Sequence, residues 1–312
     1  MVHKAVVAAL KSSREPLWIS TIGSGPESCS VVMAYSQSRP YPVWVAKISP
    51  NARMSSRLSR EYTALESMRP WAQELNLPVP LAWDCDPDQA CLILSGLAGS
   101  PESFTLIKES GMPHGLHRLE LALSWLRRFR ECVPVSAVER ELDREQCVPL
   151  IPDPVFEGRP FLALCELLRD QRPQLPSVPS HGDFWRGNLL FDGPRVTVLD
   201  WDALGLRSPL HDLVSLFSSS GYLRDGRIRQ QVDTARIVEL FFSETAAALR
   251  TREIVSGLDT SPDDLQRAFY SFIRHRLRSG GSESRAIWSG ILRVLHGHGF
   301  PAPWSCCLSA GV

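Results

Sequence analysis

The sequence predicts an α+β protein whose first part is rich in strands and whose second part is rich in helices. Short runs of β-branched and aromatic residues, separated by Gly, Ser and Pro, predict several strands between residues 17 and 48. Beyond residue 98 the apolar residues recur every three to four positions, as in amphipathic helices. This change of periodicity divides the chain into residues 1–98 and 99–312.

The individual elements follow from the same two periodicities. Strands are expected over 17–22, 29–35, 42–48 and 91–94, and a helix over 52–69. In the second part helices are expected over 117–130, 227–250, 263–277 and 284–295. The helix that begins near Asp263 has a capping Ser261 and a proline at its first position, Pro262.

The composition excludes several classes of function. The 34 basic residues balance the 34 acidic residues, so no overall field attracts a nucleic acid or an anionic membrane. No stretch predicts a membrane span, and the apolar run Ala5 to Leu10 is too short for the core of a signal peptide. The eight cysteines form no Cys-x-x-Cys pair and no zinc pattern. We therefore expect reduced thiols and a cytoplasmic protein without nucleic-acid or membrane partners.

An unusual polar segment, HGDFWRGNLL, spans residues 181–190 and precedes a predicted hairpin. Asp192-Gly193 lies between two apolar runs, which indicates a tight turn between antiparallel strands. If Phe191 pairs with Val196, Asn188 lies opposite the residue before Asp200. The hairpin then brings the Asn188 amide and the Asp200 carboxylate to one end, close to Asp183.

Two acids and an amide in one place favour a cation between them, and oxygen donors of this kind suit Mg²⁺. Each fragment alone has a plainer explanation, since Asp-x-x-x-x-Asn is common and His-Gly-Asp can be an ordinary loop. Their combination before Leu-Asp-Trp-Asp favours a functional site.

The motifs HGDFWRGNLLFD, VTVLDWD and SPLHDL together closely resemble the aminoglycoside phosphotransferase family of small-molecule kinases. That family is related to choline kinases and, more distantly, to protein kinases. The resemblance implies a protein-kinase-like fold of two lobes. An antiparallel-sheet lobe over 1–98 would bind the nucleotide, and a mainly helical lobe over 99–312 would carry the catalytic loop, the metal site and the acceptor site.

The resemblance also implies roles for single residues, with ATP and Mg²⁺ as cofactors. Asp183 matches the catalytic aspartate that accepts or orients the proton of the acceptor hydroxyl. Asn188 and Asp200 match the metal ligands. His181 matches a histidine that supports the catalytic loop, and Asp212 an aspartate that braces it.

The first part supplies candidates for the nucleotide site. Lys47 ends a predicted strand, and Glu61 lies fourteen residues later on the same helix face as Leu58 and Leu65. Alone, Lys47 could equally be a lysine on an exposed strand edge. By resemblance it matches the phosphate-binding lysine, with Glu61 as its partner and Glu66 as a weaker alternative on another face.

Two loops complete the expected nucleotide site. Gly23, Ser24 and Gly25 lie between the first two strands, where a turn over the phosphates belongs, although alone they would indicate an ordinary turn. Ser95 to Leu97 matches, by position, the hinge that meets adenine through its backbone.

The resemblance has departures near the acceptor. Trp185-Arg186 replaces the His-Pro or similar pair often found in this loop, and the helix over 117–130 lacks the Leu-His that the family often shows. Arg186 is the only cation between Asp183 and Asn188, so we expect it to contact the γ-phosphate. The alternative is a surface arginine without a role.

These observations predict an ATP- and Mg²⁺-dependent phosphotransferase that acts on a hydroxyl of a small molecule. A protein kinase is the first alternative, disfavoured because only eight residues separate Asp200 from Pro209. A catalytically silent, nucleotide-binding pseudokinase is the second, disfavoured because a binding module has no need of Asp183. The segment 261–312 has three acids against six arginines, which favours a sugar or sugar-like acceptor over a polycationic aminoglycoside.

Overall fold

The computed structural model describes residues 3–13, 15–22, 28–85, 89–100, 113–138, 177–207, 209, 211–213 and 215–216. The chain divides into two compact units. The first contains residues 1–102, 120–140 and 181–205, and the second contains 103–119, 141–180 and 206–312. The boundary expected at residue 98 stays a prediction.

Some of the expected features lie outside the described residues. These are the turn of Gly23, Ser24 and Gly25, and the helices over 227–250, 263–277 and 284–295.

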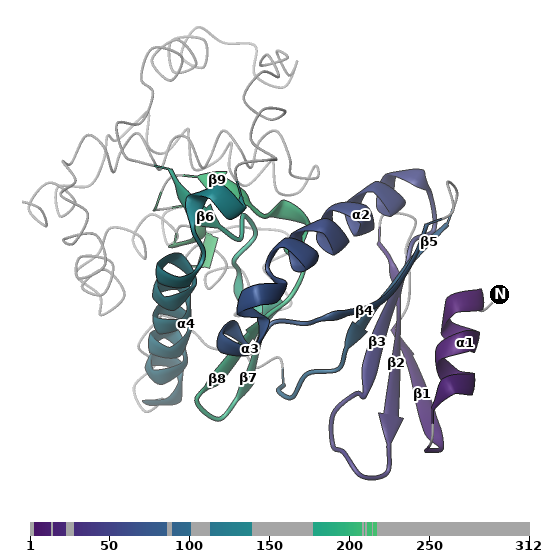
Figure 1. Cartoon of the computed structure of the whole chain (residues 1–312). Helices are drawn as coiled ribbons and strands as arrows, with labels where there is room; N and C mark the ends of the chain where they lie inside the picture. Colours follow the sequence, from purple (N-terminus) through teal and green to yellow (C-terminus); the bar gives the residue numbers. More distant parts are fainter. Residues whose placement is uncertain are drawn as a thin grey trace, which may run out of the picture. The chain divides into compact units, whose positions relative to one another are not determined.

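A five-stranded antiparallel sheet forms the centre of the first unit (Figure 1). Its order is β1-β2-β3-β5-β4, with β1 at Leu17–Ile22, β2 at Ser30–Ser36, β3 at Trp44–Ile48, β4 at Pro80–Cys85 and β5 at Ala90–Ser95. The strands expected from the sequence are confirmed as β1, β2, β3 and β5. The edge strand β4 was not expected, because Pro80 at its start and Asp84 near its end leave an apolar run of only three residues between them.

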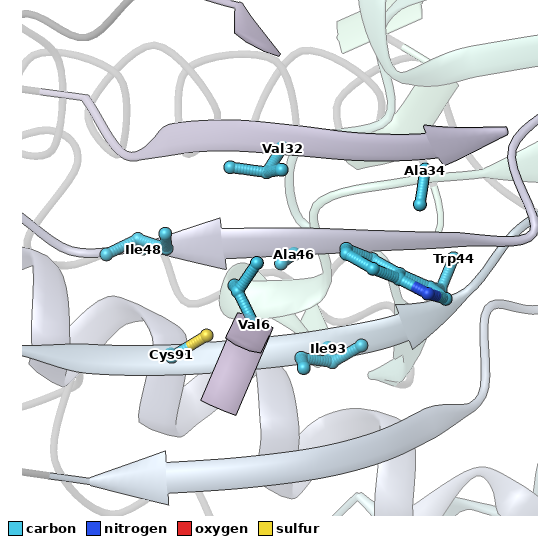
Figure 2. Packing of buried hydrophobic residues seen from close by; sticks show 8 residues of the cluster. All are labelled: Val6, Val32, Ala34, Trp44, Ala46, Ile48, Cys91 and Ile93. Carbon is cyan, nitrogen blue, oxygen red and sulfur yellow. The ribbon is translucent and has the colours of Figure 1, made fainter. Parts of the chain in front are cut away.

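One face of this sheet is covered by the N-terminal helix α1 (Lys4–Ser12), which the sequence did not predict. Its Val6 is completely buried against alternate residues of the strands, as Figure 2 shows. The cluster comprises Val6, Val32, Ala34, Trp44, Ala46, Ile48, Cys91 and Ile93. The helix begins at His3, whose Nδ1 accepts a hydrogen bond from the Ala5 N–H at 3.2 Å. The cap, the buried Val6 and the partly buried Ala5, Ala9 and Leu10 therefore hold a helix of only nine residues in place.

Helix α2 (Ala52–Ser67) lies on the other side and contacts β4 and β5 (Figure 1). It begins at Asn51, whose side chain accepts a hydrogen bond from the Met54 N–H at 3.1 Å. Trp44, Ala46 and Ile48 point toward α1, so the alternation of strand residues turns Lys47 to the opposite face. Glu61 is buried on α2, as the periodicity predicted.

The chain then continues through the short helices η1 (Arg69–Trp71) and α3 (Ala72–Leu75). Helix α4 (Pro113–Cys132) extends the predicted helix over 117–130 at both ends. Within the first unit its Trp125 stacks on Phe129 and Phe184, with ring centroids 5.4 and 5.6 Å apart, and Trp201 meets Phe129 edge-on. Because these rings come from α4 and from both sides of the hairpin, they fix the polar segment to the helix.

The remaining strands are short. β7 (Leu189–Asp192) and β8 (Arg195–Val198) form the predicted hairpin, and β6 (Val178–Ser180) pairs with β9 (Gly205–Arg207). The 3₁₀ turns η2 (Val135–Ala137), η5 (Arg186–Asn188) and η6 (Trp201–Ala203) complete the described elements. Among the helices described, none has the length and apolar character needed to cross a bilayer.

Candidate active site

The hairpin has the register expected from the sequence. Phe191 pairs with Val196, and Gly193 in the turn has a positive φ of 54°. One residue beyond the paired strands, the Leu199 N–H donates to the Asn188 carbonyl at 2.9 Å. Asn188 and Asp200 therefore lie at the same end of one ribbon, as predicted.

His181 is fully buried at the centre of the loop that precedes the hairpin. Its Nδ1 accepts from the backbone N–H of Asp183 at 3.3 Å, so the ring proton lies on Nε2 and is donated to the Leu199 carbonyl at 2.9 Å. One imidazole thus joins the residue before Asp200 to Asp183. That His181 supports a catalytic loop, as the resemblance implied, stays a prediction.

Asp183 lies in a tightly folded turn. Gly182 before it has φ +83°, and a Cβ there would overlap the Ala203 carbonyl. The Asn188 side-chain NH₂ donates to the Asp183 carbonyl at 3.0 Å and lies 3.4 Å from its Oδ2. Because the amide nitrogen faces Asp183, the amide oxygen of Asn188 is turned away from it.

Lys47 joins the two halves of the predicted site within the first unit. Its Nζ donates to both oxygens of Glu61, at 2.7 and 2.9 Å, and also contacts Asp200 Oδ1. The side chains of Lys47 and Glu61 are 14% and 4% exposed, whereas that of Asp200 is 47% exposed. A buried glutamate therefore positions the lysine from one side, and the more accessible Asp200 contacts it from the other.

The electrostatics of this triad favour the charged forms of Lys47 and Asp200. Burial lowers the pKa of Lys47, but the attraction of Asp200 and Glu61 outweighs burial and raises it. The Lys47 ammonium holds the pKa of Asp200 below its ordinary value. Burial raises the pKa of Glu61, and Lys47 opposes that change. Lys47 and Asp200 are consequently fully charged near neutral pH.

Asp200 has a left-handed backbone, with φ 59° and ψ 70°. Few residues other than glycine adopt this conformation, and it is frequent at functional sites. No group of three or more His, Cys, Asp or Glu that could hold an ion occurs in the part of the chain that is described. The donors at the end of the hairpin are instead one carboxylate and one amide oxygen, which fits a hard divalent cation that also binds phosphate oxygens.

Three further residues of this region were missed by the sequence reasoning. Arg57 Nε donates to Asp202 Oδ2 at 2.6 Å, and Arg60 Nε donates to the Asp202 carbonyl at 3.3 Å. The hydrogen bond to Asp202 raises the pKa of Arg57, and the negative charges of Asp200 and Asp183 add to that shift. The spacing of Arg57, four residues before Glu61, is the signal that could have found the first of them.

The other expected residues have varied surroundings. Ser95 donates its N–H to the Val79 carbonyl at 2.8 Å and accepts from the Val79 N–H at 2.9 Å, so it holds the end of β5. Leu97 is half-buried two residues later. Arg186 is buried in η5, and burial lowers its pKa. Asp212 is fully buried in the second unit. The functional roles of these residues stay predictions.

The comparisons with known proteins bear on this geometry. A family model described as "phosphotransferase enzyme family" matches residues 110–248, the segment that contains the loop of His181 and Asp183 and the hairpin. The resemblance to the aminoglycoside phosphotransferases is confirmed. The expectation of an enzyme with phosphotransferase chemistry is confirmed at the level of this family.

Solved structures of such phosphotransferases have the same fold. The aminoglycoside phosphotransferase APH(4)-Ia, in complex with ADP and hygromycin B, is 14% identical, with a TM-score of 0.57 over 96% of this chain and 99% of that chain. A macrolide 2'-phosphotransferase from Brachybacterium faecium is 18% identical, with a TM-score of 0.51 over 93% of this chain and 98% of that one. The α+β two-lobe fold class is thereby confirmed. No curated protein sequence matches the chain.

Proposed function

We propose that the protein transfers the γ-phosphate of ATP to a hydroxyl group of a small molecule, with Mg²⁺ as cofactor. The observation that carries this proposal is the contact of Lys47 with both Glu61 and Asp200. A lysine so placed neutralises phosphate oxygens on a nucleotide, while the glutamate keeps it extended. The phosphotransferase family of the segment 110–248 supports the same chemistry.

In the proposed reaction Asp183 acts on the acceptor. The acceptor oxygen forms a bond to the γ-phosphorus as its proton passes to the Asp183 carboxylate. The bond between the γ-phosphorus and the bridging oxygen breaks, and its electron pair leaves with ADP. His181 and Asn188 keep Asp183 in place through the bonds to its backbone N–H and carbonyl.

Asn188 and Asp200 are the residues that would hold Mg²⁺. The ion supplies charge neutralisation to the phosphate oxygens when it is bound. We further propose that Arg186 contacts the γ-phosphate, that Ser95 to Leu97 meet adenine, and that the turn of Gly23, Ser24 and Gly25 covers the phosphates. Asp212 is proposed to brace the catalytic loop.

The acceptor is proposed to be a neutral or anionic hydroxyl compound, such as a sugar or sugar-like metabolite. The three acids in 261–312 are too few to surround a polycation, and the six arginines there would repel one. The described cysteines, Cys29, Cys85, Cys91 and Cys132, are free thiols, which supports a cytoplasmic location.

The experiment is a screen of ADP release from Mg²⁺-ATP over aminoglycosides, macrolides, free sugars, nucleosides, amino alcohols and hydroxy acids. We expect turnover with at least one neutral or anionic acceptor. Asp183→Asn should remove nearly all of it while nucleotide affinity stays within a few-fold, because Asp183 faces the acceptor. Asp200→Ala should instead weaken binding of Mg²⁺-ATP.

The alternatives give different outcomes. Thermal stabilisation by nucleotide without turnover over the whole panel would indicate a pseudokinase. Efficient phosphorylation of kanamycin- or neomycin-type compounds would overturn the proposed acceptor class. If Asp183→Asn lost nucleotide affinity as strongly as rate, the role of Asp183 would be wrong.

A further inference from the structure

A pair of charged contacts connects helix α2 to the turn η6 that follows Asp200. Arg57 Nε donates to Asp202 Oδ2 at 2.6 Å, and Arg60 Nη2 lies 3.9 Å from the same oxygen. Arg60 Nε also donates to the Asp202 carbonyl at 3.3 Å. The Asp202 side chain is only 12% exposed, whereas those of Arg57 and Arg60 are 45% and 49% exposed. A nearly buried carboxylate thus contacts two arginines that lie three residues apart on the helix.

The turn that these arginines contact has a strained residue at its start. Asp200 is in the left-handed region at φ 59°, and such a conformation persists only where the surroundings over-determine it. Before Asp200, Leu199 is held by its N–H bond to Asn188 and by the His181 ring. After Asp200, the buried Trp201 donates from Nε1 to the Val198 carbonyl at 2.8 Å. These contacts fix the turn to the hairpin, but none of them connects it to helix α2.

Helix α2 supplies that connection through the same face that bears Glu61. Arg57 precedes Glu61 by four residues, so both side chains extend from adjacent turns of one helix face. Glu61 fixes Lys47, and Lys47 contacts Asp200; Arg57 fixes Asp202, two residues beyond Asp200. Helix α2 therefore reaches Asp200 by two routes. Glu61 holds Lys47, which contacts the Asp200 carboxylate, and Arg57 holds Asp202, which follows Asp200 in the backbone.

We propose that Arg57 and Asp202 form a positioning pair that sets Asp200 for the divalent cation. Neither residue is a ligand of the ion in this proposal. The pair keeps η6 against α2, and the backbone of Asp200 then holds its carboxylate beside Lys47 and at the same end of the hairpin as Asn188. This inference rests on the proposed function, because it assigns the pair to the metal site of that function.

The test is a double-mutant cycle of Arg57→Gln and Asp202→Asn, measured by calorimetric titration of Mg²⁺ into each protein with saturating AMP-PNP. Partners of a metal ligand typically change metal affinity by tenfold or more, so each single variant should weaken Mg²⁺ binding about tenfold. The double variant should bind Mg²⁺ no more weakly than the weaker-binding single variant, because both substitutions remove the same contact between Arg57 and Asp202. Affinity for AMP-PNP without Mg²⁺ should stay within about twofold of the parent, because the pair acts through Asp200.

Arg127→Gln is the matched control. Arg127 makes a comparable 2.8 Å contact with Glu131, but both side chains are largely exposed, at 79% and 60%, on helix α4. This variant should bind Mg²⁺ as the parent does. If Asp202→Asn does not fold, Arg57→Gln still tests the proposal, since the Arg57 side chain is 45% exposed.

Several results would overturn the proposal. One is a Mg²⁺ affinity of Arg57→Gln equal to that of the parent, at a temperature where the variant is folded. Another is a loss of Mg²⁺ affinity in the double variant that equals the product of the losses in the two single variants. An equal loss of Mg²⁺ affinity and of metal-free nucleotide affinity would indicate general damage to the site instead of positioning of Asp200. A parent protein that binds no Mg²⁺-AMP-PNP would overturn the proposed function together with this inference, whereas a normal parent with unaffected variants would overturn the inference alone.

Discussion

Replacing Glu61 by Gln removes one charge from the buried ion pair of Lys47 and Glu61 and changes few atoms. Glu61 accepts two hydrogen bonds from Lys47, at 2.7 and 2.9 Å, and its side chain is 4% exposed. After the substitution the Lys47 ammonium keeps an amide oxygen and the contact with Asp200. It loses the neighbouring negative charge that compensates for its own burial.

The size of the effect follows from these contacts. Breaking a buried ion pair by removing one partner typically costs about 3–5 kcal/mol. Asp200 still neutralises Lys47 and the amide retains one acceptor, so we expect a smaller loss, of about 2–3 kcal/mol in the free energy of unfolding. At roughly 2–4 °C per kcal/mol, the melting temperature should fall by about 4–12 °C.

The assay is urea denaturation followed by tryptophan fluorescence, together with a thermal melt, both at neutral pH. Glu66→Gln is the control, because Glu66 lies on the same helix and pairs with Arg69 through two contacts. The side chains of that pair are 33% and 49% exposed, so water screens the interaction. The control should melt within a degree or two of the parent, which an exposed ion pair permits.

One result would refute this reasoning directly. Burial raises the pKa of Glu61, and if the pKa lay above the pH of the assay, the carboxyl group would already be neutral. Glu61→Gln would then unfold at the same urea concentration as the parent. Equal stability of Glu61→Gln and Glu66→Gln would therefore show that Lys47 is paired with Asp200 alone.

Three further variants test the loop that precedes the hairpin and the hairpin turn. Gly182→Ala should lower the free energy of unfolding by more than about 2 kcal/mol, because the new Cβ would overlap the Ala203 carbonyl at a positive φ. Gly193→Ala, at φ 54° with open space around the Cβ, should cost only about 1 kcal/mol in the same urea assay, and equal losses would contradict the steric argument. Arg186→Ala should lower the turnover number by about 100-fold or more if the guanidinium contacts the transferring phosphate. An unchanged turnover number would leave Arg186 without a catalytic role.

Much of the fold was accessible from local patterns. The hairpin could be predicted because the Asp192-Gly193 turn and the alternation on either side fix the register within ten residues. Helix α2 and the burial of Glu61 followed from the apolar spacing. Helix α1 was missed, because an apolar run of six residues has no periodicity that separates a helix from other structures, and its burial depends on a sheet formed later in the chain.

By itself the sequence determined the strands β1, β2, β3 and β5, the hairpin β7–β8, and the approach of Asn188 to Asp200, since local turn and pairing rules decide these. Only the tertiary structure brought Lys47 to Asp200, which lies 153 residues further along the chain, and showed that Arg57 and Asp202 meet. No local rule specifies such contacts, because they depend on how α2 and the hairpin pack within one unit. The burial of Glu61 and of Trp201 decides these contacts. Each is buried by a core that several segments of the chain build together.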